Sequence, residues 1–331
     1  MTNQGIFRVY LWLALLAAAL FLASLLTGRA ALPLGQLLQP DSAGSEMVRT
    51  ILWEIRLPRA LLAVLVGAAL GLSGAALQGF LRNPLADAGI IGVSASASLG
   101  AVLALYSGLA ASFALALPLG GLLGASLSVV VIYMLAGRDA SILTLILAGV
   151  AVNSFSGALT ALVLNLAPNP YAILEIVFWL LGSLADRSFD HVLLAAPFIL
   201  LGSAWLLTTG RALDALSLGE DAAQSLGFSI ARLRLAVIGG TALCVGAAVA
   251  VSGAIGFVGL VVPHLLRPFA GQRPGALLGL SALGGAALLL AADIGVRLIP
   301  TQAELKLGVV TALIGGPFFL WLLLRMRRTM P

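Results

Sequence analysis

The chain has 331 residues, of which 61% are hydrophobic and 9% are charged, and its formal net charge is +5. A soluble domain of this length needs more polar residues to wet its surface, so this composition excludes that class. Several runs of 18 or more residues carry no charge, which is typical of membrane-spanning helices, and the alternation of a membrane β-barrel is absent. We therefore predict an all-α membrane protein.

The rarest residue types exclude several kinds of functional site. Cys244 is the single cysteine and there are two histidines, which excludes an internal disulfide and argues against a metal site. The basic residues are scattered among loops and give no sign of nucleic-acid binding. The single lysine, Lys306, follows a leucine, whereas a P-loop needs Gly-Lys-Ser/Thr. We expect no cofactor on this chain, and any ATP hydrolysis must come from another subunit.

Ten apolar segments are predicted to form transmembrane helices. In chain order they are residues 9–27, 60–80, 93–112, 114–136, 141–166, 191–209, 235–254, 256–270, 275–296 and 306–324. The first resembles a signal peptide but is long for one, so a retained helix is expected. After the fifth segment, Pro168 and Pro170 interrupt the chain. The amphipathic piece that follows, residues 171–181, is expected to lie at the membrane interface, where aromatic side chains prefer to sit.

The longest charged stretch, residues 211–234, separates the sixth segment from the seventh. Its apolar residues recur at three- and four-residue steps, which predicts short amphipathic helices. Residues 217–220 (SLGE) match a capping box, with Glu220 and Asp221 in a first turn, and Gly227 suits the left-handed position that ends a helix. Composition alone leaves two interpretations open, a solvated loop or a helix pair that presses against a partner.

The distribution of basic residues predicts the orientation. With the N-terminus inside, inner loops hold eleven Lys and Arg residues and outer loops seven, which favours cytoplasmic N- and C-termini. The stretch 211–234 then lies in the cytoplasm. Arg56, Arg59 and Arg297 fall at outer helix ends, where an acidic partner could neutralise them. The alternative is that they bind lipid phosphates or snorkel to the interface.

An internal repeat predicts the architecture. Residues 66–75 read VGAALGLSGA and residues 245–254 read VGAAVAVSGA, and a basic, proline-containing motif follows each, at 81–84 and 263–268. The copies lie on the second and seventh predicted helices, an odd step apart. We therefore predict an inverted-topology repeat.

The repeat halves comprise helices 2–5 and 7–10, at about residues 60–166 and 235–324, within one permease domain over 1–331. Small residues at four-residue spacing, Gly67, Gly71 and Ala75, are expected to let helix backbones approach closely.

Several blocks resemble the FecCD/BtuC-type permeases, which are the membrane subunits of ABC importers for ferric siderophores, haem and vitamin B12. These blocks are residues 56–59 (RLPR), 66–101, 218–227, 252–267, 291–293 and 304–311, and they stand in the family's order. The resemblance implies a permease of the bacterial inner membrane that forms a homodimer, with the substrate path along the dimer axis. It also implies two cytoplasmic ATPase subunits, which bind ATP and Mg, and a periplasmic binding protein on the opposite face.

The resemblance assigns roles to individual residues. The coupling helices that sit in a cleft of each ATPase match Leu216, Ser217, Leu218, Gly219, Glu220, Asp221, Ala222, Leu226 and Gly227. Arg56, Arg59 and Arg297 match positions that pair with acidic residues of the binding protein. The path is expected along the fifth helix and residues 171–181, with Asn153, Ser154, Ser156, Thr160, Phe178 and Trp179 as candidates. The polar candidates on the fifth helix could instead simply join helices by hydrogen bonds.

The expected function is ATP-driven uptake of a ferric siderophore or haem, with a corrinoid as the alternative. Some haem permeases of the family carry an arginine just before an aromatic pair, whereas residues 174–179 (LEIVFW) hold no basic residue, which weakens haem.

Two other classes of protein fit the sequence less well. An intramembrane serine protease would use Ser73 with His264 as base, but the repeat carries a second serine, Ser252, which favours helix packing. An ion-driven secondary transporter usually has charges inside its helices, whereas Asp293 and Glu304 lie near helix ends.

Overall fold

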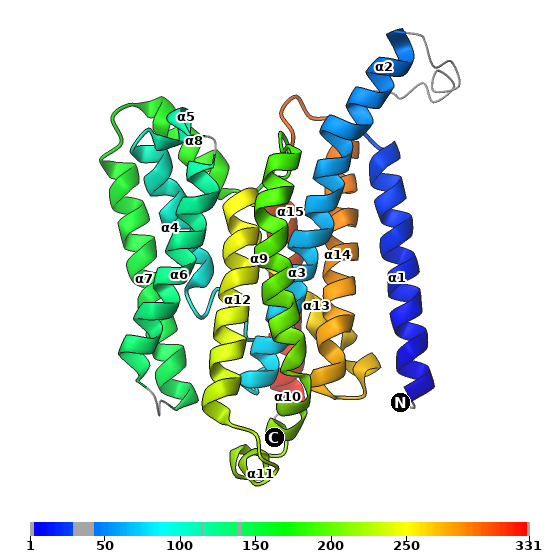
Figure 1. Cartoon of the computed structure of the whole chain (residues 1–331), viewed down its shortest axis with the longest axis vertical. Coiled ribbons are helices and arrows are strands. Elements are labelled where there is room, and N and C mark those ends of the chain that lie inside the picture. Colours follow the sequence, from blue (N-terminus) through cyan, green and yellow to red (C-terminus); the bar gives the residue numbers. More distant parts are fainter. Residues whose placement is uncertain (1–2, 29–42, 114, 138–140, 330–331) are drawn as a thin grey trace.

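The computed structural model describes residues 3–28, 43–113, 115–137 and 141–329, and within these ranges every regular element is a helix (Figure 1). Seven of the described helices are long and apolar enough to cross a membrane, and four shorter apolar helices accompany them. The all-α membrane fold predicted from composition is thereby confirmed.

The ten predicted segments all coincide with helices. The elements are α1 (Asn3–Leu26), α2 (Ala43–Thr50), the π-helix η2 (Ile51–Arg56), α3 (Leu57–Phe80), α4 (Val93–Tyr106), α5 (Leu109–Ser112), α6 (Ala116–Ala136), α7 (Ile142–Asn165), α8 (Pro170–Leu180), α9 (Phe189–Thr208), α10 (Gly210–Leu216), α11 (Glu220–Ser225), α12 (Ile230–Ser252), α13 (Val258–Leu266), the 3-10 helix η3 (Arg267–Ala270), α14 (Pro274–Leu298) and α15 (Leu307–Thr329). The part of the connection before α3 that the structure describes from residue 43 on is helical, since α2, η2 and α3 run on without a break. The third predicted segment divides into α4 and α5 at Gly108, which has a φ of 73°.

α3 and α12 form the centre of the bundle, and α1 lies at its edge. The most apolar windows of the spans that contain α3 and α12 are 78% and 83% buried, against 6% for α1. These two central helices carry the two copies of the repeat, and they run in opposite directions (Figure 1). This antiparallel pair is what an inverted-topology repeat requires.

α3 packs on α14 backbone to backbone. A Cβ on Gly67 would overlap the carbonyl oxygen of Gly285, and one on Gly71 would overlap that of Ser281. Since any side chain at these positions would push the helices apart, the small residues predicted to permit close packing do so. α4 and α6 meet in the same way, through Gly100 and Gly120.

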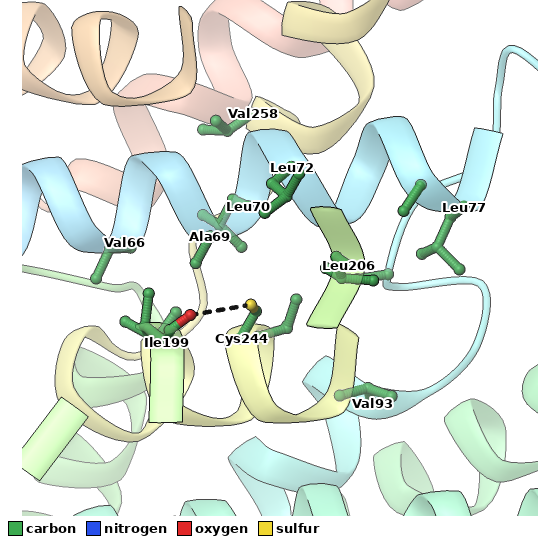
Figure 2. Close-up of a cluster of buried hydrophobic side chains, with 14 of the residues drawn as sticks. Val66, Ala69, Leu70, Leu72, Leu77, Val93, Ile199, Leu206, Cys244 and Val258 are labelled. Carbon is green, nitrogen blue, oxygen red and sulfur yellow. Dashed lines mark hydrogen bonds between the residues drawn. The ribbon is translucent and has the colours of Figure 1, made fainter. Parts of the chain in front are cut away.

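The other face of α3 packs against α9 and α12 around the single cysteine (Figure 2). Cys244 on α12 is fully buried, and its thiol donates a weak hydrogen bond to the carbonyl oxygen of Ile199 on α9, at 3.6 Å. Val66 and Ala69 of α3 lie in the same cluster (Figure 2). The thiol therefore serves as a small core residue.

Different helices lie at the two ends of the bundle. α10 and α11 lie at one end, here called the α11 end, whereas α2 and α8 lie at the other, the α2 end (Figure 1). α1 begins at the α11 end and α15 runs toward it (Figure 1). That arrangement agrees with the expectation that both termini share a side with residues 211–234, while the identity of that side stays a prediction.

Candidate functional site

The α11 end carries a compact helix pair where the sequence predicted one. α10 and α11 are joined at Gly219, whose φ of 115° belongs to the region that glycine alone adopts readily. Leu213, Leu216 and Ala223 are fully buried and attach the pair to the bundle. Leu218 and Leu226 remain 72% and 61% exposed, so the pair also presents apolar side chains outward.

The ends of α11 test two predictions about its capping. Glu220 and Asp221 do lie in its first turn, and Gly227, with a φ of 87°, does end it: the Gly227 amide donates to Gln224 O and the Phe228 amide to Ala223 O. The capping box was wrong. Ser217 lies at the end of α10, and its hydroxyl donates to Asp214 O at 2.6 Å instead of capping α11.

The remaining coupling candidates lie on the same pair. Ser217 and Asp221 are exposed, and Ala222 is half-buried. Glu220 reaches Arg82, which follows α3, in a loose ion pair of 3.9 Å between two partly exposed side chains. The structure thus brings the predicted coupling residues together on one protruding element that also touches the end of the central helix.

The predicted docking arginines form one buried ionic network at the α2 end. Arg59, in the first turn of α3, donates from Nε and Nη2 to Oδ1 of Asp293 on α14, at 2.9 and 2.7 Å. It also donates from both terminal nitrogens to Glu304, which precedes α15. Because Asp293 is fully buried, leaving its carboxylate without a positive partner would be costly, and the guanidinium beside it offsets that cost.

Arg56 and Arg297 extend this network to α1. Arg297 pairs with Asp293 at 2.8 Å and donates to the carbonyl oxygens of Ser24 and Thr27 at the end of α1. Arg56 donates to the carbonyls of Leu25 and Leu26. Helix C-termini leave such carbonyls without partners and favour nearby cations, so the two arginines cap α1.

The three arginines are only 4–9% exposed, which shows how fully the chain itself uses them. The sequence showed Asp293 and Glu304 but not that they are the partners of Arg59. The sequence signal for this pairing was Asp293, because α14 has no other acidic residue and a lone carboxylate in an apolar helix needs a basic partner.

The path candidates on α7 divide into two groups. Ser156 is buried, and its hydroxyl lies 2.9 Å from that of Ser96 on α4, so it joins two helices. Thr160 donates to Ser156 O within α7. Asn153 and Ser154 lie on the exposed side of α7. The structure therefore supports an interhelical role for Ser156 and leaves the path role of the exposed pair a prediction.

The aromatic candidates lie on α8, at the α2 end of the bundle. Phe178 is 52% exposed, and Nζ of Lys306 lies 5.7 Å from the centre of its ring. Trp179 is half-buried against the core. Ser73 and Ser252, the serines of the protease alternative, are both almost fully buried, so a substrate could not reach either of them.

A helical bundle whose two repeat copies run antiparallel and which carries a protruding helix pair is typical of a transport permease. Comparison with known proteins agrees with this class. The model of the FecCD transport family matches residues 15–325. The chain belongs to the FecCD transport family.

Relatives across bacteria share most of the chain. The chain is 44% identical to "Uncharacterized ABC transporter permease protein YvrB" of Bacillus subtilis, over 87% of this chain and 83% of the relative. It is 42% identical to "Vitamin B12 import system permease protein BtuC" of Vibrio cholerae, over 87% of each chain. It is 40% identical to "Hemin transport system permease protein HmuU" of Yersinia pestis, over 83% of each chain.

A solved structure shares the fold. It is an inward-facing conformation of a metal-chelate type ABC transporter, with a TM-score of 0.86 and 34% sequence identity, covering 96% of this chain and 99% of that one. The predicted family resemblance is thus confirmed.

Proposed function

We propose that this chain is the transmembrane subunit of an ATP-driven type II importer that moves a ferric siderophore or haem from periplasm to cytoplasm. The relatives named for hemin and vitamin B12 and the metal-chelate transporter support this class of cargo. A corrinoid is the alternative cargo. The observation that carries the proposal is the α10–α11 pair, which exposes Leu218 and Leu226 although the bundle needs only its buried face.

In this proposal the exposed face of α10 and α11 sits in a cleft of a partner ATPase. The partner binds ATP and Mg, because the sequence has no Gly-Lys-Ser/Thr motif. Closure of the two ATPases moves the helix pair of each permease subunit. The repeat halves then rock against each other, which exposes the cavity to alternate sides.

The path lies at the axis of a homodimer. Asn153 and Ser154 on α7 and Phe178 on α8 are open on a single subunit, and a second copy would enclose them. Polar and aromatic side chains together suit a bulky chelate with both polar and apolar surface.

The binding protein docks at the α2 end, which places that end in the periplasm of a cell with an inner membrane and the α11 end in the cytoplasm. Arg56, Arg59 and Arg297 attract its acidic residues. Since the chain's own carboxylates already occupy Arg59, docking requires an incoming acid to share or displace Glu304, whose side chain is 21% exposed, against 0% for Asp293.

The experiment tests whether the exposed face of α11 binds the partner ATPase. Leu226→Asp places a charge on the exposed apolar face, and we expect it to abolish co-purification of the ATPase and to reduce uptake at least about tenfold, since an unpaired charge at an interface costs several kcal/mol. Leu226→Met keeps the face apolar and is the matched control, with expected uptake near that of the unchanged protein.

The readouts are ATPase recovered per permease and uptake of a labelled chelate. Normal recovery and uptake with Leu226→Asp would contradict the coupling role. Recovery of a homo-oligomer without any ATPase, even from the unchanged protein, would favour the ion-driven class instead.

A further inference from the structure

A second group of arginines surrounds a pocket at the α11 end. The pocket has a volume of about 240 Å³, and Arg82, Arg267 and Arg273 line it together with Gln78 and Ser217. No carboxylate is among the described residues that line it. The volume is below the roughly 300–1,000 Å³ of typical small-molecule sites, so the pocket suits a compact anion better than a metal chelate.

The fold brings the two basic motifs of the repeat to this one pocket. Arg82 follows α3, whereas Arg267 follows α13, which packs so tightly on α3 that a Cβ on Gly74 would overlap Gly259. Gln78 joins the two: its buried side chain donates to Gly259 O at 3.3 Å and accepts from Nη2 of Arg267 at 2.6 Å. One wall of the pocket is therefore held in place by side-chain hydrogen bonds.

The chain itself engages the guanidinium groups around the pocket only in part. Nε of Arg267 is buried with no hydrogen-bond partner among the described residues. The Arg273 side chain is exposed and makes no hydrogen bond or ion pair with any residue that the structure describes. Arg82 has the loose 3.9 Å contact with Glu220. Since a buried donor without an acceptor costs about 1–3 kcal/mol, a ligand that accepts from Nε of Arg267 is favoured, and the exposed Arg82 and Arg273 can add their charge to it.

Backbone strain gathers at the same place. Arg82 and Gln272, with φ of 48° and 61°, are two of the four non-glycine residues with positive φ in the described chain, and both line the pocket. Such conformations cost free energy and concentrate at binding sites. At the N-terminus of α14 beside the pocket, the Gly275 amide already donates to Asp214 at 2.7 Å. The arginine side chains are therefore the groups that offer donors to a ligand.

We propose that this pocket binds a phosphate group, supplied either by an anionic lipid headgroup or by a soluble phosphate. Guanidinium groups match phosphate oxygens through paired charge-assisted hydrogen bonds. Basic pockets between helices at a membrane surface are suited to such headgroups. The inference does not depend on the cargo or on the ATPase, and the permease alone can test it.

The experiment compares the unchanged permease, purified in a maltoside detergent, with three variants. Arg267→Gln/Arg273→Gln removes two charges from the pocket, and Arg273→Gln alone removes an exposed side chain whose loss leaves the fold intact. Arg211→Gln/Arg232→Gln removes the same charge from exposed positions at the same end but outside the pocket, as the control.

Inorganic phosphate is titrated at constant ionic strength against chloride, and thermal stabilisation is recorded. Native mass spectrometry then counts retained phosphatidylglycerol against phosphatidylcholine. We expect the double pocket variant to bind at least about tenfold more weakly and the single variant to lie between, with the control unchanged.

Saturable phosphate binding without lipid retention identifies a soluble anion, and selective phosphatidylglycerol retention identifies a headgroup; either supports the proposal. Equal binding by the unchanged protein and both pocket variants, or stabilisation by chloride as strong as by phosphate, would overturn it.

Discussion

Arginines gather at both ends of the α3–α14 pair, and the two groups are treated in opposite ways. α3 has 24 residues, so its ends lie about 36 Å apart. At the α2 end, Asp293 and Glu304 neutralise Arg59, and α1 carbonyls receive Arg56 and Arg297. At the α11 end, Arg82, Arg267 and Arg273 face a pocket without a carboxylate among its described lining.

The two groups differ in how far the chain itself neutralises them. An arginine that the fold buries permanently must be given acids and carbonyls by the chain itself, because a buried unpaired charge is too costly. An arginine that the chain leaves partly unpaired at the rim of a pocket has water as its resting partner and is available to a ligand. The same residue type thus joins helices at one end and is open to an anion at the other.

The largest expected effect comes from removing the acid that neutralises the arginines at the α2 end. Asp293→Asn removes the charge that Arg59 and Arg297 share, and we expect it to destabilise the protein by about 3–5 kcal/mol, the usual cost of leaving a buried partner uncompensated. Thermal unfolding in detergent measures the loss. An unfolding temperature unchanged by Asp293→Asn would mean that the network contributes nothing to the fold.

A smaller, opposite effect is expected for Asp87, a half-buried acid in the loop after α3. Burial raises the pKa of Asp87, which the hydrogen bond from the Ala88 amide lowers in part, and no arginine among the described residues compensates it. A raised pKa in the folded state means that the charged form destabilises the fold, progressively as pH rises above the ordinary value of about 3.9. Asp87→Asn should therefore raise the unfolding temperature slightly at pH 8 and less so at pH 5. A loss that is greater at pH 8 would contradict this sign.

The smallest effect on stability is expected at the rim of the pocket. Glu220→Gln removes a partly exposed ion pair of 3.9 Å, which is worth about 0.5 kcal/mol or less. The released Arg82 should then bind phosphate up to about twofold more tightly, because one competing charge is gone. Phosphate titration of Glu220→Gln beside Glu220→Asp, which keeps the charge, measures the difference. Weaker binding by Glu220→Gln would place Arg82 outside the site.

Long uncharged runs made the helices predictable, because in a membrane an unbroken apolar stretch has few alternatives to a helix. The rule does not reach the helix over residues 43–56, because charged residues interrupt its apolar sequence. The capping box failed for a local reason. Ser217 ends α10, so its hydroxyl bonds back to Asp214 rather than forward into α11.

Contacts between residues far apart in the chain could not be predicted from the sequence. The motifs at 81–84 and 263–268 were visible as basic, but their meeting depends on the chain turning back after Phe257, where φ is 68°. Arg56, Arg59 and Arg297 were recognised as a group, whereas their partners lie on α1, on α14 and before α15. Only the packing of these elements shows which charges the chain neutralises.

The bond between Arg59 and Asp293 also has a consequence for biogenesis, because 234 positions separate the two residues. A ribosome adds about 5–20 residues per second, so α3 enters the membrane roughly 10–50 s before the carboxylate that neutralises it exists. During that interval we expect the guanidinium to stay at the interface with water or lipid phosphate. We therefore expect α3 to reach its final depth and neighbours only after α14 has been inserted.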